Sequence, residues 1–550
     1  MKKTSFLRVV KDVKNGFWHL PPVLLLPFGA VLCALCLIYP AIGFIQWFSM
    51  IPALYYLFSR VEKAGMRLRR AYGLGFLYFY SFYLVIWHWF TDLYPMEFAG
   101  VTKGEAILLI AICWFGLSLL QALLSALTLP VLLLLSRVRL LKRYPVLLPF
   151  LFASVYTVAE WAQTISWAGV PWARLVLGQS ACGVLFGGAA LFGSYFVTFA
   201  IVAVNGFAAY AILHLDRVRL CATACAVVFL FSLAAGTIGY FTAPTGGENG
   251  VIVAAVQGNV GSSEKWTSAS NTRSYEVYEK YTAEAKAQGA QLVLFPETFM
   301  PYRITESSNL GVYVRGLAKK YDIIIRCGGF YYDDETDKLY NGLFTVYPDG
   351  SIDDIVYAKR RLVPFGEFVP MRSVVETLVP PLADMGMLSE DLDAGEDSAV
   401  VKTDIGAIGS LICFDSIYED LTLDAVRDGA ELICLSTNDS WFLDSVGIYM
   451  HHRQAQLRAV ESGRYIIRSA DTGISSVIAP DGSAEAELPP LVDGISVATV
   501  YPTAQRTLYS CIGNAVVYLM IAAELVLAAD GLICYVRRRR KNEAPTGDEA

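Results

Sequence analysis

The chain has 550 residues, of which 55% are hydrophobic and 17% charged, and its mean hydropathy is positive at +0.46. This composition excludes a wholly soluble enzyme and indicates that part of the chain lies in a lipid bilayer. The formal net charge of −6 is small for this length and no basic stripe accompanies it, which argues against a nucleic-acid partner.

Eight apolar runs approach the roughly 20 residues that a membrane-crossing helix needs, seven of them before residue 247 and one after residue 504. They lie at about 19–38, 40–58, 74–92, 106–135, 146–165, 184–213, 219–241 and 508–536. We therefore predict a membrane domain of seven transmembrane helices at residues 1–246, an eighth helix within 505–536 and a basic cytoplasmic tail at 537–550. The first run has no small-residue cleavage site before a soluble start, so we interpret it as an anchor rather than a secretory signal.

Basic residues in short loops mark the cytoplasmic side of a membrane protein. Here they gather in the N-terminal segment, in the second, fourth and sixth connections between apolar runs, and in the sequence RRRRK at 537–541. Both termini are therefore predicted to be cytoplasmic, and residues 247–504 are predicted to lie on the outer face of the membrane.

Residues 247–504 have the composition of an ordinary globular domain, with periodic short strands and turn dipeptides. The predicted elements are a strand at 251–257, a helix at 273–288, a strand at 291–297, a helix near 308–320, a strand at 322–329, a hairpin across Asp349-Gly350, a proline-rich segment, a hairpin turning at 403–406, a strand ending at Cys413, a helix near 418–428, a strand at 431–436, a helix at 447–463 and three final strands. Strands that alternate with helices, with hairpins added, predict a mixed sheet layered with helices and catalytic groups at strand ends.

Three predicted strands end in residues that can carry chemistry, namely Glu297, Lys359 and Cys413. Each alone has an ordinary explanation, because such an acid is usually solvated, such a lysine is usually surface charge, and a free cysteine is usually core. The combination is more informative than any one residue.

Cysteine spacing gives no sign of a disulfide framework or a zinc site in this domain. Only three of the eleven cysteines lie there, Cys327, Cys413 and Cys434, and all three fall at or within apolar strand-like runs. His451 and His452 are adjacent, and no cysteine pair has the spacing of zinc ligands. We predict that neither a metal nor a cofactor takes part, and that Cys327 and Cys434 are core residues.

The segments FPETFMPY, KRRLVPFGEFVP and LICFD, in this order, resemble the signature segments of the nitrilase superfamily, the carbon–nitrogen hydrolases. The resemblance implies an α-β-β-α layered fold in which Glu297 is the general base, Lys359 the oxyanion stabiliser and Cys413 the nucleophile. Glu367 matches the supporting second glutamate of the superfamily. The family cysteine is typically followed by an aromatic residue and a glutamate, whereas this chain has Phe414 and the shorter Asp415, so the contacts of that acid must lie closer.

These residue types suit acyl transfer. A thiol with a pKa near 8.5 is mostly protonated at neutral pH, so a carboxylate base and an ammonium both favour its attack on a carbonyl. The ammonium and the backbone N–H of Phe414 are suitable partners for the resulting oxyanion. The product is a thioester that a second nucleophile resolves, which gives a ping-pong scheme.

The whole chain resembles the apolipoprotein N-acyltransferase family over nearly its full length. Further matching segments are VQGNVGSSEKW, which ends in Trp266, SWAGVPWARLVLGQS, RYIIRSADTGISSVIAPDG and TNDSWFLDS, which contains Trp441. The resemblance implies a monomeric enzyme of the bacterial cytoplasmic (inner) membrane that moves an acyl chain from a phospholipid to the N-terminal amine of diacylglyceryl-cysteine lipoproteins. It also implies substrate contacts for Trp266 and Trp441, with membrane lipids as surroundings.

Two other functions remain open from the residues alone: a membrane-anchored amide hydrolase of the same superfamily, and a catalytically dead scaffold or transport protein. Two local features also have two readings each, and a third has one. The apolar segment 374–388 either meets the membrane or a partner or packs on its own domain. Trp167 and Trp172 either anchor at the interface or line an acyl channel, and Glu160 is a rare acid near a predicted span, which indicates function by default.

Overall fold

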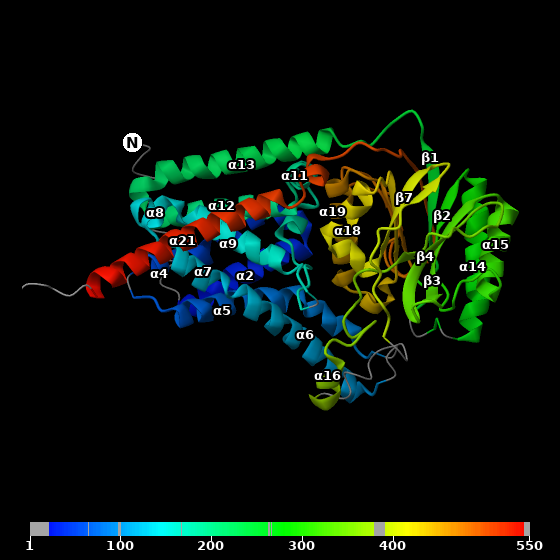
Figure 1. Cartoon of the computed structure of the whole chain (residues 1–550), viewed down its shortest axis with the longest axis horizontal. Coiled ribbons are helices and arrows are strands. Elements are labelled where there is room, and N and C mark those ends of the chain that lie inside the picture. The colour runs from blue at the N-terminus through cyan, green and yellow to red at the C-terminus, as the bar shows by residue number, and fades with distance from the viewer. Residues whose placement is uncertain are drawn as a thin grey trace, which may run out of the picture.

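The computed structural model describes residues 21–63, 65–96, 101–166, 168–261, 264, 265, 267–378 and 391–543. Figure 1 shows a helical half with its long helices roughly side by side, and an α/β half at the other end of the long axis. The chain enters the α/β half after α13 and returns to the helical half through α21.

The helical half is built from helices joined by short turns. In chain order they are α2 (Pro22–Ile38), η1 (Pro40–Ile45), α3 (Gln46–Ser49), α4 (Ile51–Val61), α5 (Leu68–Ile86), η2 (His88–Leu93), α6 (Lys103–Ser125), α7 (Thr128–Leu135), α8 (Arg139–Arg143), η4 (Pro145–Leu147), α9 (Leu148–Ala162), η5 (Leu175–Gln179), α10 (Gly183–Phe186), α11 (Gly188–Phe192), α12 (Ser194–Leu213), η6 (Leu215–Arg217), α13 (Val218–Phe241), α20 (Leu508–Ile512) and α21 (Ala515–Glu543).

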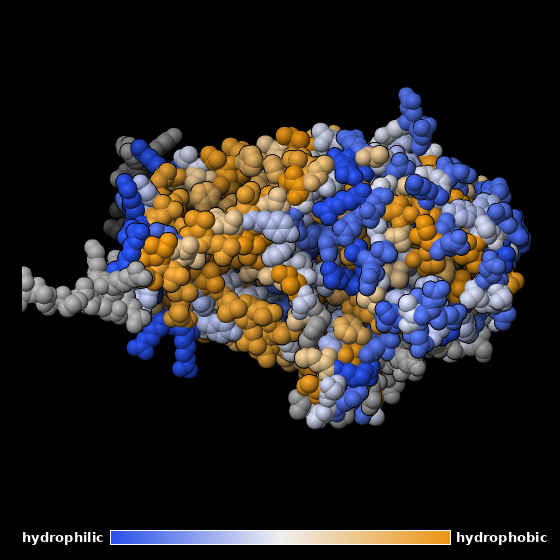
Figure 2. Space-filling model, in the orientation of Figure 1, coloured by the Kyte–Doolittle hydropathy of each residue, from blue (hydrophilic) through white to orange (hydrophobic). Residues whose placement is uncertain are grey.

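Within the described residues, six helical stretches are long and apolar enough to cross a membrane. They are Pro40–Val61, Lys103–Leu135, Pro145–Ala162, Ser194–Leu213, Leu215–Phe241 and Ala515–Arg537. Large apolar side chains cover their outer surfaces, and Figure 2 shows the resulting apolar belt, with hydrophilic residues beyond it at both ends. A patch of this extent is stable against lipid rather than water, so the protein is a membrane protein.

The predicted spans at 19–38 and 74–92 have no counterpart among these six, since the α-helix of the second, α5, ends at Ile86, and a third predicted span is divided. The run at 184–213 divides at Gly193, whose φ of 81° ends α11 before α12 begins. A side chain there would also meet Tyr509, since an added Cβ would lie 2.4 Å from its ring. The run at 19–38 gives the shorter apolar helix Val23–Ile38 within the described residues.

The α/β half contains two six-stranded sheets. The first has the order β12 (Gly494–Val500), β1 (Val251–Gln257), β2 (Leu292–Leu294), β3 (Ile324–Asp333), β4 (Lys338–Val346) and β5 (Tyr357–Ala358). The second has the order β11 (Ala484–Glu485), β10 (Ser476–Ile478), β9 (Ile466–Ala470), β8 (Leu432–Thr437), β7 (Gly406–Ile412) and β6 (Val401–Thr403). The central strands β1, β2 and β3 run parallel, as do β7, β8 and β9, and the outer strands are antiparallel.

The sheets face each other across an apolar core and carry helices on their outer faces. Residues such as Val253, Leu294, Ile412 and Cys434 fill the space between them. Helices α14 (Ser268–Ala287) and α15 (Asn309–Tyr321) cover the first sheet, and α18 (Glu419–Arg427) and α19 (Val446–Ser462) cover the second. This arrangement confirms the predicted layered α/β domain with mixed strand directions. The central strands could be predicted because strands buried on both faces appear in the sequence as continuous apolar runs.

Most predicted elements of this domain appear within a few residues of their expected bounds. One prediction was wrong: four strands follow α19 instead of three, because β11 has only two residues and carries no apolar alternation to reveal it. Cys327 and Cys434 are fully buried in strands, as predicted.

Candidate active site

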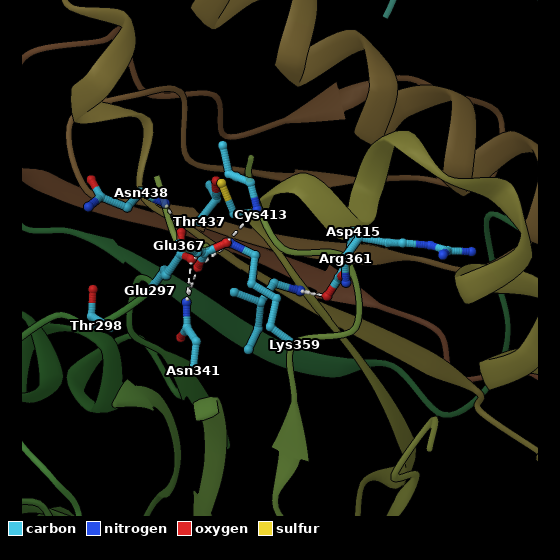
Figure 3. Close-up of polar contacts among 12 residues, drawn as sticks. Glu297, Thr298, Asn341, Lys359, Arg361, Glu367, Cys413, Asp415, Thr437 and Asn438 are labelled. Atoms are coloured by element: carbon cyan, nitrogen blue, oxygen red, sulfur yellow. Dashed lines mark hydrogen bonds and ion pairs between the residues drawn. The ribbon is translucent and has the colours of Figure 1, made fainter. Parts of the chain in front are cut away.

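Glu297 and Lys359 are buried, and the half-buried Glu367 completes a charged group with them. The Lys359 ammonium lies 2.9 Å from a carboxylate oxygen of Glu297 and 2.9 Å from one of Glu367. Glu297 follows β2 and Lys359 follows β5 directly, so residues more than 60 positions apart meet because their strands belong to one sheet. Figure 3 shows these side chains converging beside Cys413.

Two asparagines complete the cage around the carboxylates. Asn341 on β4 donates to Glu297 at 2.7 Å and to Glu367 at 3.1 Å. The backbone N–H of Asn438, after β8, donates to the other oxygen of Glu297 at 2.8 Å. Sequence reasoning missed both residues, although a polar Asn341 within an apolar strand was a signal that could have been used.

Cys413 begins the short helix η7 (Cys413–Ile417), called the Cys413 turn below, immediately after β7. Its φ of 49° is in the left-handed region, which a non-glycine residue adopts only when its surroundings hold it there. Burial raises the pKa of the Cys413 thiol, Glu297 adds to this effect and Lys359 opposes it. The thiol therefore needs a base to remove its proton at the moment it reacts.

Lys359 keeps its charge despite its burial. Burial alone would lower the pKa of the ammonium, but Glu297 and Glu367 outweigh this effect and hold that pKa well above its ordinary value. A permanent cation beside a thiol and a carboxylate can stabilise an anion that develops on a bound carbonyl.

Asp415 connects the Cys413 turn to the strand that carries Lys359. It accepts hydrogen bonds from the N–H of Ile412 at 3.0 Å, the N–H of Arg361 at 2.8 Å and the hydroxyl of Tyr357 at 2.8 Å. Burial raises the pKa of Asp415 to about 6. Asp415 is shorter than the glutamate typical of the family, but its hydrogen-bond partners lie close enough for it to reach them directly.

The remaining predicted site residues, one supporting and two substrate-binding, have different positions. Phe414 is half-buried and packs its ring edge against Tyr418, with 5.6 Å between centroids. Trp441 is half-buried in η8 (Asp439–Phe442), between β8 and α19. Trp266 lies outside the described residues, as does Trp167.

Trp172 and Glu160 are both buried. Trp172 is 3% exposed and stacks on Trp87 and His451, so it does not belong to a lipid-facing aromatic belt. Glu160 on α9 accepts hydrogen bonds from the N–H of Leu175 at 3.0 Å and the hydroxyl of Thr198 at 2.7 Å, which fixes η5 against α12. The apolar segment 374–388 is described only to residue 378, where α16 (Arg372–Leu378) exposes Val374.

Comparisons with known proteins agree with this arrangement. The carbon-nitrogen hydrolase family model matches residues 252–508, and the model of the apolipoprotein N-acyltransferase N-terminal domain matches residues 18–207. Apolipoprotein N-acyltransferase of Brucella melitensis is 30% identical over 405 residues, covering 70% of this chain and 74% of the relative. That of Gloeobacter violaceus is 28% identical and covers 91% of this chain and 92% of the relative.

Among solved structures, an amidase of the nitrilase superfamily from Nesterenkonia is 18% identical, with a TM-score of 0.37. The match covers 50% of this chain and 98% of the amidase. With the two family models in chain order and relatives matched over most of their length, this chain belongs to the apolipoprotein N-acyltransferase family.

Proposed function

We propose that this protein acylates lipoproteins by moving a fatty acyl chain from a membrane phospholipid to the N-terminal amine of a diacylglyceryl-cysteine acceptor. The observation that carries the mechanism is the meeting of Cys413 with a buried Lys359–Glu297 pair in a domain joined to an apolar helical half. The family relationship supplies the acceptor and the donor.

In the first half-reaction, Glu297 takes the thiol proton while the Cys413 sulfur adds to the ester carbonyl of the phospholipid. Lys359 stabilises the oxyanion, with the N–H of Phe414 as a further donor. The C–O bond then breaks, Glu297 returns the proton to the leaving lysophospholipid alcohol, and a thioester remains on Cys413.

In the second half-reaction, the acceptor amine adds to the thioester carbonyl and Glu297 receives a proton from the nitrogen. The C–S bond breaks, an amide forms, and the sulfur leaves as a thiolate that takes the proton back from Glu297. Glu367 and Asn341 support this chemistry by orienting Lys359 and Glu297.

We assign residues 1–246 to a membrane domain with seven spans, 247–504 to the catalytic domain on the outer face, 505–536 to an eighth span and 537–550 to the cytoplasmic tail. The alternation of basic loops supports this topology, with both termini in the cytoplasm. Trp266 and Trp441 are assigned to substrate contacts, and the enzyme acts as a monomer on this proposal.

The test is to trap the thioester. Purified protein incubated with phospholipid alone should gain the mass of an acyl group on the peptide that contains Cys413, removable by neutral hydroxylamine. Cys413→Ala should not form the adduct, whereas the matched variants Cys327→Ser and Cys434→Ser, which change buried thiols in β3 and β8, should form it. An adduct that persists in Cys413→Ala overturns the assignment.

Adding an amine acceptor separates transfer from hydrolysis. The acyl-enzyme should be discharged by a diacylglyceryl-cysteine peptide, giving an N-acyl product by mass spectrometry, and should persist in buffer without it. Rapid release of free fatty acid without acceptor would favour the hydrolase alternative.

A further inference from the structure

A buried histidine contacts the backbone of the Cys413 turn. His451 on α19 is 1% exposed, and its Nε2 lies 3.1 Å from the hydroxyl of Ser416 and 3.3 Å from the carbonyl oxygen of Cys413. Its other nitrogen, Nδ1, lies 2.8 Å from a carboxylate oxygen of Asp439. The ring therefore joins the Cys413 turn to η8.

The hydrogen bonds around the ring determine where its protons lie. The Ser416 hydroxyl is 2.7 Å from the Cys413 carbonyl, which can only accept, so the single hydroxyl hydrogen is directed there. The Nε2 atom of His451 then faces only oxygen lone pairs, and Nδ1 faces a carboxylate. Both ring nitrogens must donate to satisfy all of these contacts.

Two charged groups face the ring, Asp439 and Arg468. Burial opposes the ionisation of Asp439, but Arg468 and His451 outweigh it and hold the pKa of that carboxyl well below its usual range. Arg468 lies 2.7 Å from the second oxygen of Asp439 and also donates to the carbonyl of Ile474. One nitrogen of Arg468 also lies 3.4 Å from Nδ1, but Nδ1 is closer to the Asp439 carboxylate, at 2.8 Å, and donates there.

The space around this group is closely fitted. Gly473 packs against Asp439, and an added Cβ there would lie 2.1 Å from the carboxylate. Two aromatic rings flank His451: Trp172 from the helical half stacks at 5.8 Å with planes 25° apart, and Phe442 approaches at 5.6 Å. The faces of aromatic rings attract cations, so this surround favours an imidazolium over a neutral ring.

We propose that His451 is a positioning residue for Cys413, which carries protons on both ring nitrogens, pairs with Asp439 and donates through Nε2 to the Cys413 turn. This proposal rests on the proposed function, in which Cys413 is the nucleophile. The donation holds the left-handed backbone of Cys413 in place. The positive charge beside the turn favours the thiolate, as Lys359 does, while the carboxylates of Glu297 and Asp439 disfavour it.

The first test measures the rate at which iodoacetamide alkylates Cys413 in the full-length protein in lipid nanodiscs as the pH is varied. His451→Gln keeps a donor but loses the charge, so the midpoint of the profile should rise by about one pH unit or more. The matched control is His452→Gln, the next residue on the same helix, which contacts the Ser476 hydroxyl at 2.9 Å and whose pKa burial holds well below its usual value. Its profile should coincide with that of the wild type, and a coincident His451→Gln profile overturns the proposal.

The second test uses the unaltered protein and so does not depend on the folding of a variant. The chain has five histidines, and solid-state NMR of protein labelled with ¹⁵N histidine reports the protons on each ring. At about pH 8, where an ordinary imidazole is neutral, one ring should retain both protons and bond to a carboxylate. Because His214 also lies 2.9 Å from a carboxylate, that of Glu62, the signal should persist in His214→Gln. Five neutral rings at that pH overturn the proposal.

The outcomes separate this proposal from the function on which it rests. If Cys413→Ala still forms an acyl adduct, the proposed function fails, and the NMR result still reports on the His451 ring. If the adduct forms on Cys413 while His451→Gln leaves the alkylation profile unchanged, only the role of His451 fails.

Discussion

Two glutamates hold Lys359 at the same distance, but their other contacts differ. Glu297 is 5% exposed, receives an N–H from Asn438 and acts electrostatically on the Cys413 thiol. The second oxygen of Glu367 instead accepts the N–H of Val363, in its own loop. Glu297 therefore lies where a general base for the thiol is needed, and Glu367 lies where it can orient Lys359.

Replacing each glutamate with glutamine should separate these roles. Glu297→Gln should slow acyl-adduct formation by about 10²- to 10⁴-fold, the usual contribution of a general base. Glu367→Gln should slow it by a smaller factor, because Lys359 keeps its contact with Glu297. Single-turnover rates with phospholipid alone measure the loss in each variant. Equal losses in the two variants would show that Glu297 and Glu367 do not have different roles.

At this scale the sequence predicted the residues that lie within contiguous signature segments. Glu297, Lys359, Glu367 and Cys413 come together as predicted, while their catalytic roles remain predictions. Asn341, Asn438 and His451 were not predicted, because each reaches the site through strand pairing or helix packing that no local spacing reveals.

The Cys413 turn shows how one element can be fixed by a single buried acid. Asp415 accepts three hydrogen bonds, from the N–H of Ile412 just before the turn, from the N–H of Arg361 in the segment after β5, and from the hydroxyl of Tyr357. Because all three partners are donors, the site is built for a carboxylate with four lone pairs and no proton.

Asp415→Asn should therefore damage the turn although its size is unchanged. The amide N–H₂ would face a donor, leaving at least one buried group without a partner at a cost of about 1–3 kcal/mol. We expect a lower midpoint of thermal unfolding and slower adduct formation, both measured in detergent at neutral pH. Asp424→Asn, a matched change on the partly exposed face of α18, should leave the unfolding midpoint and the rate unchanged. If Asp415→Asn also changes neither, Asp415 does not hold the Cys413 turn.

The elements that the sequence predicted best are those with a clear period or boundary. The strand at 251–257 matches β1, and Ser445 and Gly463 mark the two ends of α19 as cap residues do. Gly193 divides a predicted span with a φ of 81°, and the nearby Tyr509 ring leaves no room for a side chain there, a tertiary contact absent from the local pattern.

For the whole molecule, the topology proposal has a direct test. Pro244 follows α13 and Arg143 ends α8, and the basic loops assign them to opposite sides of the membrane. A reporter that is active only outside the cytoplasm should give signal when fused after Pro244 and none when fused after Arg143. The reverse pattern would show that the protein has the opposite orientation in the membrane and that the catalytic domain does not lie on the outer face.

The two halves are joined by a buried group of charges rather than by apolar packing alone. Arg174 from the helical half donates to Glu419 on α18 and, at 3.2 Å, to the carbonyl of Ile417 at the end of the Cys413 turn. Arg458 and Glu461 on α19 pair at 2.7 Å beside them. The helical half thus contributes directly to the placement of the turn that carries Cys413.

Burial opposes the ionisation of Glu419, but Arg174 and Arg458 outweigh it and hold its pKa at about 2, below the ordinary 4.5. A depressed pKa means that the ionised carboxylate stabilises the folded state above about pH 4.5, and that this contribution is lost as the pH falls towards 2. Arg174→Met leaves a buried carboxylate with less compensation, which typically costs about 3–5 kcal/mol. The loss in thermal stability should be full at pH 7 and should shrink below pH 4.5.

The double variant Arg174→Met/Glu419→Met distinguishes a structural pair from a positioning one. Removing both charges should restore much of the stability lost in Arg174→Met, because replacing a whole buried pair with apolar residues is often near neutral. Adduct formation on Cys413 should stay slow, since the Ile417 carbonyl still lacks its Arg174 donor. Full recovery of both stability and rate in the double variant would show that Arg174 only balances charge, and that the catalytic half places Cys413 without help from the membrane half.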